Sequence, residues 1–303
     1  MKFILRVKTE IYKLFNTIIY IFTLKKKILI NNSWVQHCGQ NIIKGNLGDD
    51  LNFYLLSTIL PQKYFSSYSL FFFNKATPNF LCIGSIVDTL MDRNSIVWGS
   101  GAIEGKKILN FKPLKVYAVR GPLTRNYLLK NNIECPRIYG DPAILLPFIF
   151  KRNECSKKYK IGVIPHYVDN SQKNIIDFID ENKDSVIKIE MTGYNSLEDV
   201  ITIINQCEII ISSSLHGLII SDAYDIPNLW CVFSNGIKGD KFKFHDYLLG
   251  VGRGQTEPIN LKDIKLNLDK IIELCNVNYN KPTLNAKALL DCCPFKHNLK
   301  IPE

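Results

Sequence analysis

The segment from Ser212 to Pro227, SSSLHGLIISDAYDIP, holds residues whose types and spacing could bind an anion. A buried strand that runs into three serines and a histidine at a helix start presents hydroxyls, an imidazole and unpaired backbone N–H groups. A phosphate or carboxylate is expected there, in contact with Ser213, Ser214, His216 and Gly217. The serines could instead cap the helix, and a backbone carbonyl could satisfy His216.

Arg120, in the motif VRGPLTRNYLL, is a second candidate. The strand pattern ends at this arginine, and Pro122 is expected at the first position of the following helix, where its missing N–H costs little. A guanidinium binds carboxylate or phosphate through two parallel hydrogen bonds. Arg120 is therefore predicted either to hold a ligand or to be a structural arginine paired across the domain. Arg125, one turn later, is expected on the solvated face.

The motif GNLGDD, residues 45–50, combines two glycines with two carboxylates at a predicted helix start. Glycine lets the backbone approach a ligand closely. Asp49 could cap the helix or act as a general base on a hydroxyl group. We expect Asn46 and Asp50 to contact substrate.

Two further motifs place ionisable groups near predicted strand ends. PHYVD, residues 165–169, sets His166 at the end of a strand, where it could donate or accept a proton or cap the next turn. GDKFKFHDYLLG, residues 239–250, is a predicted loop that could form a lid or an acceptor platform. Its ionisable side chains are Lys241, Lys243, His245 and Asp246.

Strands and helices must alternate to position these residues. Apolar runs at 80–87 and 95–103 both lead into glycine, as the strands of βα units do. The same alternation resumes after the basic segment 151–160, which is the predicted linker. YGDPAILLP, residues 139–147, is expected to form a rigid inter-domain turn because Asp141 precedes a proline.

The predicted fold is α/β, with two Rossmann-like domains and the active site in the cleft between them. The expected boundaries are an N-terminal amphipathic segment at 1–33, domains at 34–150 and 151–275, and a C-terminal tail at 276–303. The region after Lys262 is expected to hold one helix and that tail.

Composition narrows the function classes. The 303 residues carry a net charge of +10, which favours anionic partners, but no nucleic-acid motif accompanies it, so nucleic acid is not expected. Nine cysteines without CxxC spacing indicate a reduced, cytoplasmic compartment rather than a disulfide scaffold or zinc site. No His or carboxylate pair has ligand spacing, so neither a metal nor another cofactor is expected.

The N-terminal segment is basic and apolar. Its longest uncharged run, Leu14 to Leu24, is shorter than the roughly 20 residues that span a bilayer. Two interpretations stay open: an amphipathic helix packed on the body, or a basic, aromatic-rich helix lying on the cytoplasmic face of the inner membrane.

Seven motifs, read in order, resemble the polysaccharide pyruvyl transferase family, closest to the succinoglycan-type pyruvyl (ketal) transferases. They are GNLGDDLN, WGSGAI, VYAVRGPLT, YGDPAILLP, IGVIPHYVD, SSSLHGLIISDAYDIP and KFKFHDY, and they span Gly45 to Tyr247. The resemblance implies two Rossmann-like domains arranged like GT-B glycosyltransferases. It also implies phosphoenolpyruvate as donor on the C-terminal side, and a saccharide acceptor, lipid-linked or nucleotide-free, on the N-terminal side.

The same resemblance implies that Arg120 and His216 hold phosphoenolpyruvate. Many members carry Arg where this chain has Ser214, so Lys243 is expected to substitute for that charge. Forming a cyclic ketal requires an acid and a base. The hypothesis is that His166 and Asp49 face the acceptor, while Arg120, His216 and helix amides neutralise the departing phosphate.

Two other functions stay open at this stage. A glycosyltransferase with a nucleotide-sugar donor would need a carboxylate on the ribose, and Asp222 could supply it. A non-catalytic saccharide-binding protein of the assembly machinery would tolerate loss of Arg120 and His216.

Overall fold

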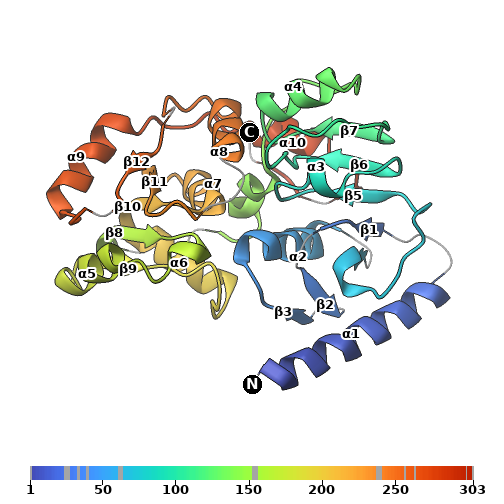
Figure 1. Cartoon of the computed structure of the whole chain (residues 1–303), viewed down its shortest axis with the longest axis horizontal. Coiled ribbons are helices and arrows are strands. Elements are labelled where there is room, and N and C mark those ends of the chain that lie inside the picture. Colours follow the sequence, from blue (N-terminus) through green and yellow to red (C-terminus); the bar gives the residue numbers. More distant parts are fainter. Residues whose placement is uncertain are drawn as a thin grey trace.

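Two parallel β-sheets of five strands each organise the chain (Figure 1). The computed structural model describes residues 2–23, 28–32, 35–38, 41–60, 64–151, 156–236, 241–255, 257–262, 264–297 and 299–301. The predicted α/β class with two Rossmann-like sheets is confirmed. The predicted linker at 151–160 lies partly outside the described residues.

The first sheet has the strand order β4-β1-β5-β6-β7. All of its pairings are parallel. Its strands are β1 (Ile28–Ile30), β4 (Tyr64–Ser66), β5 (Asn79–Leu81), β6 (Ser95–Trp98) and β7 (Lys115–Ala118). Strand β1 joins this sheet although it precedes residue 34.

The second sheet has the order β12-β11-β10-β8-β9, again entirely parallel. Its strands are β8 (Tyr159–Ile164), β9 (Val186–Lys188), β10 (Cys207–Ser212), β11 (Asn228–Val232) and β12 (Ile259–Asn260). Numbered within each half, both sheets follow the order 2-1-3-4-5. In such doubly wound sheets the connections reverse direction between the first and third strands, and ligands bind beyond the carboxyl ends there.

Helices connect the strands on both faces. The helices of the first half are α2 (Leu47–Ile59), α3 (Val87–Leu90) and α4 (Pro122–Lys130). A hairpin of β2 (Gln36–Cys38) and β3 (Asn41–Ile43) precedes α2, and the 3-10 turn η1 (Ser67–Ser69) follows β4. The second half contains η3 (Tyr167–Asp169), α5 (Lys173–Glu181), α6 (Leu197–Gln206), α7 (Leu215–Ala223), α8 (Phe242–Gly250) and α9 (Leu268–Asn278). Pro122 opens α4, as predicted.

The two halves share one buried apolar cluster. At its centre lies the 3-10 helix η2 (Pro142–Phe148), which packs against both α2 and α7. Asp141 caps η2 by accepting a hydrogen bond from the Ala143 N–H at 3.0 Å. The predicted turn is thus the start of an apolar connection whose Ala143 and Leu145 side chains are fully buried. This packing fixes the strand ends of one sheet relative to those of the other.

Two local predictions were wrong. The segment 239–250 was expected to be a loop, but residues 242–250 form α8, because Phe244, Tyr247 and Leu248 share one buried helix face. Residues 239 and 240 lie outside the described part.

The described residues after Lys262 form two helices rather than one, α9 and α10 (Ala286–Asp291). Helix α10 returns to the first half, where the Trp98 indole N–H donates to the Leu289 carbonyl at 2.9 Å.

Helix α1 (Lys2–Phe22) lies along the outer edge of the first half (Figure 1). It packs against β2 and η1. Among the described helices, neither α1 nor any other is long and apolar enough to cross a membrane.

Candidate active site

His216 stands where the two halves meet. Strand β10 runs into Ser214, the N-cap of α7, and His216 lies in the first turn of that helix. Its imidazole packs against Gly48 in the first turn of α2, so closely that a Cβ at Gly48 would collide with His216 Nδ1. Gly48 therefore makes room for a side chain of the other half, where the sequence had suggested close approach of a ligand.

The other imidazole nitrogen of His216 faces a buried carboxylate. His216 Nε2 lies 3.7 Å from Asp141 Oδ2, which is within ion-pair range but longer than a hydrogen bond. Neither atom has a hydrogen-bond partner in the described part of the chain, and Asp141 is fully buried. The carboxylate of Asp141 therefore faces the imidazole without a hydrogen bond between them.

Asp49 and Lys243 form the charged centre of the site. Burial raises the pKa of Asp49 to about 6, and the positive fields of His216 and Lys243 oppose that rise. Burial lowers the pKa of Lys243 to about 8; Arg120 lowers it further and Asp49 acts in the opposite direction. Asp49 comes from α2 and Lys243 from α8, so the two charges act on each other across the two halves.

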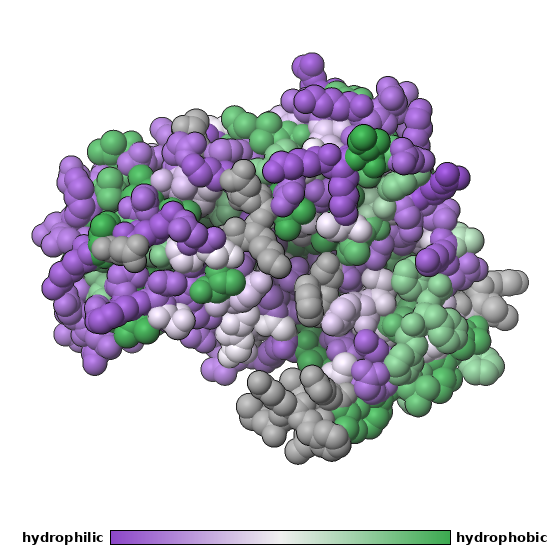
Figure 2. Space-filling model, in the orientation of Figure 1, coloured by the Kyte–Doolittle hydropathy of each residue, from purple (hydrophilic) through white to green (hydrophobic). Residues whose placement is uncertain are grey.

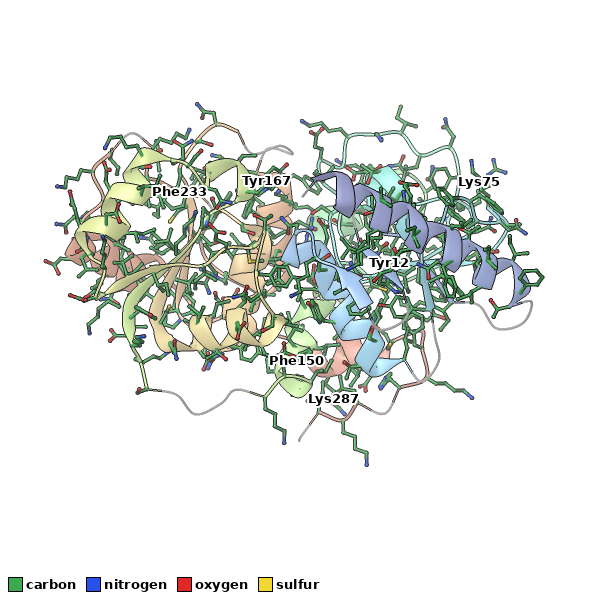
Figure 3. All side chains as sticks on the ribbon, turned by 90° about the horizontal axis from the view of Figure 1, so that it is seen from below. Tyr12, Lys75, Phe150, Tyr167, Phe233 and Lys287 are labelled. Atoms are coloured by element: carbon green, nitrogen blue, oxygen red, sulfur yellow. The ribbon has the colours of Figure 1, made fainter. Side chains whose placement is uncertain are left out.

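His166 lies just beyond the end of β8 and caps η3 weakly, accepting from the Val168 N–H at 3.5 Å. Burial lowers its pKa to about 4, Lys243 contributes to the lowering, and Asp169 opposes it. His166 is therefore a neutral imidazole at neutral pH. Its neighbour Tyr167 lies near the junction of the two halves (Figure 3).

Arg120 is fully buried two residues beyond β7 and bonds to protein groups on all sides. Its Nε donates to Asp246 Oδ2 at 3.1 Å, one terminal nitrogen to Ala102 O at 2.7 Å, and the other to Ser85 Oγ. This geometry matches the structural alternative, an arginine paired across the molecule. Arg120 still acts on the site through its field on Lys243.

Asp246 completes this network and was not among the predicted site residues. Besides Arg120, it accepts hydrogen bonds from the Thr124 N–H at 2.8 Å and the Thr124 hydroxyl at 2.6 Å. Gly121 leaves space for the Asp246 backbone, which a Cβ there would strike. The pair anchors α8, and with it Lys243, to the first half.

The predicted serine and glycine contacts of α7 have mostly structural roles. Ser213 Oγ donates to Asp169 Oδ2 at 2.6 Å and accepts from the His166 N–H at 2.9 Å. Gly217 is needed because a Cβ would collide with the Ser212 hydroxyl. Ser214 makes no side-chain capping bond, which leaves it the best placed of these residues to meet a ligand.

Asn46 and Asp50 fix the start of α2. Asn46 caps the helix by accepting from the Gly48 N–H at 2.9 Å. Asp50 is fully buried and accepts from the Gly45 N–H at 2.7 Å and the Tyr194 hydroxyl at 2.8 Å. Burial raises the pKa of Asp50 to about 6 as well. Both residues hold Asp49 in position, and their predicted contact with substrate stays a prediction.

Electrostatic effects connect Asp49 to His216 and Lys243, and connect Lys243 to His166. Lys243 supplies positive charge, and the first turn of α7 supplies helix N–H groups that lack intrahelical partners; both attract anions. Asp49 and His166 supply proton acceptors. Among the described residues, no group of three His, Cys, Asp or Glu side chains could hold a metal ion.

These features define an α/β protein of two doubly wound halves whose shared polar cluster suits a small anionic substrate. The profile of the polysaccharide pyruvyl transferase family matches residues 46–235, and the chain belongs to this family. The family resemblance carried by the sequence motifs is confirmed. All the predicted site residues except Lys243 fall inside the matched range.

Two curated relatives are similar to this chain. Uncharacterized protein L143 of Acanthamoeba polyphaga mimivirus is 33% identical over 222 residues, which cover 70% of this chain and 72% of that protein. The succinoglycan biosynthesis protein ExoV of Rhizobium meliloti (strain 1021) is 28% identical over 217 residues, 69% of this chain and 62% of that protein. Comparison with solved structures gives no significant match.

Proposed function

We propose that this protein transfers pyruvate from phosphoenolpyruvate to a sugar of an exopolysaccharide, capsule or cell-surface glycan, forming a cyclic ketal. The observation that carries the proposal is the contact of His216 with the start of α2, next to Asp49, together with the electrostatic effects that join Asp49, Lys243 and His166. Family membership and the similarity to a succinoglycan biosynthesis protein support it. Phosphoenolpyruvate is already activated, so the reaction needs no further cofactor.

The donor has a carboxylate and a phosphate, and the site offers two places for negative charge. Lys243 supplies the mobile cation, because Arg120 is already neutralised by Asp246. The first turn of α7, with His216 and Ser214, supplies the second. Lys243 thus takes the part of the arginine that many relatives carry at the position of Ser214. In this proposal the halves are arranged as in GT-B enzymes, with the donor on the second half.

The reaction balances as two additions and one departure. The methylene carbon of phosphoenolpyruvate gains a proton, and C2 forms one bond to a sugar hydroxyl oxygen. The bond from C2 to the phosphate oxygen then breaks, and a neighbouring hydroxyl closes the ring at C2. Inorganic phosphate leaves, and the two hydroxyl protons balance the proton gained by carbon and the charge on phosphate.

Asp49 and His166 handle the hydroxyl protons. His166 is neutral at neutral pH because its pKa is about 4, so it can accept a proton when a sugar hydroxyl attacks. Asp49, with a pKa of about 6, is mostly ionised at neutral pH and is the stronger base of the two. The positive charge of Lys243 stabilises the phosphate as it leaves. On this proposal the protein works on the cytoplasmic side, where phosphoenolpyruvate is made.

The test measures phosphate release from phosphoenolpyruvate with purified protein and a panel of lipid-linked and synthetic oligosaccharides. We expect release only with a matching acceptor, and losses of about 100-fold or more in His216→Ala and Lys243→Ala. Lys241→Ala is the matched control, since that lysine is exposed and pairs with Glu257 instead. Acceptor-dependent release that survives in both variants would remove these residues from the mechanism.

The glycosyltransferase alternative loses the residue on which it depended. Asp222 is buried and accepts hydrogen bonds from Asn228, Tyr247 and Arg253 at 2.7, 2.9 and 3.2 Å. It is committed to the core of the second half and has no free oxygen for a ribose. Binding of a uridine nucleotide, with indifference to phosphoenolpyruvate, would revive that alternative.

A non-catalytic saccharide-binding role is the remaining alternative. It would not require a lysine and a histidine whose pKa values are shifted by burial in the same site, since such shifts serve proton transfer. Saccharide binding without any turnover, unchanged in His216→Ala, would favour it.

A further inference from the structure

Helix α1 turns its polar side toward the protein. The Asn16 amide donates to the His37 carbonyl at 2.5 Å, and the Thr17 hydroxyl accepts from the Phe71 N–H at 3.0 Å. Tyr20 also packs inward, edge to face on Phe65. The helix is therefore held to β2 and the segment after η1 by these hydrogen bonds, and by the small apolar cluster that Tyr20 forms with Leu29 and Leu70.

The apolar side of α1 consequently faces solvent. Its exposed large apolar side chains are Val7, Ile11, Leu14, Phe15, Ile18, Ile19, Ile21 and Phe22. Most are spaced by three or four residues, which places them on one face of the helix. Phe15 is 58% exposed and Phe22 78%. An amphipathic helix that only packed on the body would bury this face instead.

Neighbouring residues extend the surface. Phe71 and Phe72 follow η1 and are 51% and 59% exposed, and the backbone of Phe71 is bonded to Thr17 of α1. Figure 2 shows the resulting apolar region at the lower right of the molecule, over α1 and the adjoining segment. We call the eight exposed side chains of α1 together with Phe71 and Phe72 the apolar face.

Described lysines lie near this face. The first 27 residues contain seven Lys and Arg against one Glu. Within the described side chains, Lys8 lies beside Tyr12, and Lys13 beside the Tyr68 ring. Lys75 is exposed next to Asn74, whose N–H donates to Tyr20. Figure 3 shows Tyr12 on α1, which lies across the first half of the protein, with Lys75 on the same side of the view.

We propose that the apolar face docks on an anionic lipid surface, with α1 lying in the plane of the interface. Apolar burial combined with basic residues is what such a surface attracts. A second copy of this chain fits less well, because a two-fold contact through α1 would bring the basic residues of both copies together. The inference does not depend on the proposed catalytic function.

Sedimentation with vesicles tests this proposal. Wild-type protein should bind vesicles of phosphatidylglycerol and phosphatidylcholine, but not of phosphatidylcholine alone, and high salt should weaken the binding. Phe15→Glu combined with Phe72→Glu should weaken binding about tenfold or more. Lys8→Gln combined with Lys13→Gln should weaken it about 30-fold. The matched control is Val277→Glu, on α9 and 74% exposed.

For each sample, light scattering measures the oligomeric state and circular dichroism checks that the protein is folded. Equal binding by wild type and the Phe15→Glu, Phe72→Glu variant would overturn the proposal, as would absence of binding to the anionic vesicles. A dimer that dissociates in this variant, without vesicle binding by wild type, would show instead that the apolar face joins two copies.

Discussion

The two sheets follow the same strand order but use their carboxyl ends differently. In the first half, Arg120 is fully buried and all three of its guanidinium nitrogens donate to protein groups, among them Asp246, which comes from later in the chain. In the second half, His216 keeps a nitrogen that only faces a carboxylate at 3.7 Å, and His166 makes one long capping bond.

This difference separates residues that hold the halves together from residues that react. A fully bonded buried charge is costly to disturb and resists proton exchange. An imidazole with an uncommitted nitrogen can transfer a proton once substrate is bound. Asp49 and Lys243 belong with the histidines, because burial shifts both pKa values toward neutrality.

The largest expected effect is on stability, at the Arg120–Asp246 pair. Asp246→Asn keeps the shape but leaves the buried guanidinium without its counter-charge, which should lower the free energy of unfolding by about 3–5 kcal/mol. Urea unfolding measures the change. Glu181→Ala, which breaks an exposed pair with Lys265, should cost less than about 1 kcal/mol. Equal losses in both variants would erase the distinction between the two classes of residue.

A smaller and more selective effect is expected at Gly48. Gly48→Ala adds a methyl group that collides with the His216 ring, so the imidazole must move. Misplacing a catalytic group by about 1 Å can cost about 100-fold in rate. Turnover should fall by that order while the thermal midpoint changes little, since alanine favours helix. Gly254→Ala, away from the site, is the control. A fully active Gly48→Ala would show that the position of His216 does not matter.

The mildest effect is on the pH profile. Below about pH 6 Asp49 takes up a proton and stops acting as a base, and above about pH 8 Lys243 loses its charge. The rate should therefore be highest between these values. Lys243→Arg should move the upper limb to higher pH, because arginine stays protonated.

Asp49→Asn should remove the lower limb of this profile. Asp50 has a similar pKa. If the lower limb persists in Asp49→Asn and disappears in Asp50→Asn, the base is Asp50 and not Asp49.

Local patterns predicted the strand ends and the residues gathered there, because parallel sheets bring their carboxyl ends to one edge. They did not predict Asp246 as the partner of Arg120, since 126 residues separate the two. Nor could they show that Gly48 accommodates His216, a contact between the two halves. Helix α8 was missed because the aromatic residues of 239–250 suggested a lid, whereas their spacing buries them.

Helix α1 shows a second limit on what can be predicted from the sequence. Its amphipathic pattern was visible, but periodicity alone does not say which side meets the protein. The hydrogen bonds of Asn16 and Thr17 decide this, and they depend on partners in β2 and after η1.

The most direct test of the account is to follow carbon-13 at C2 of phosphoenolpyruvate by NMR, with wild-type protein and an acceptor that supports phosphate release. The account predicts that the label becomes a ketal carbon bonded to two oxygens of the sugar, and that Lys243→Ala and His216→Ala abolish this signal while Lys241→Ala keeps it. Label found only in free pyruvate, or left in phosphoenolpyruvate with every acceptor, would contradict pyruvyl transfer by this site.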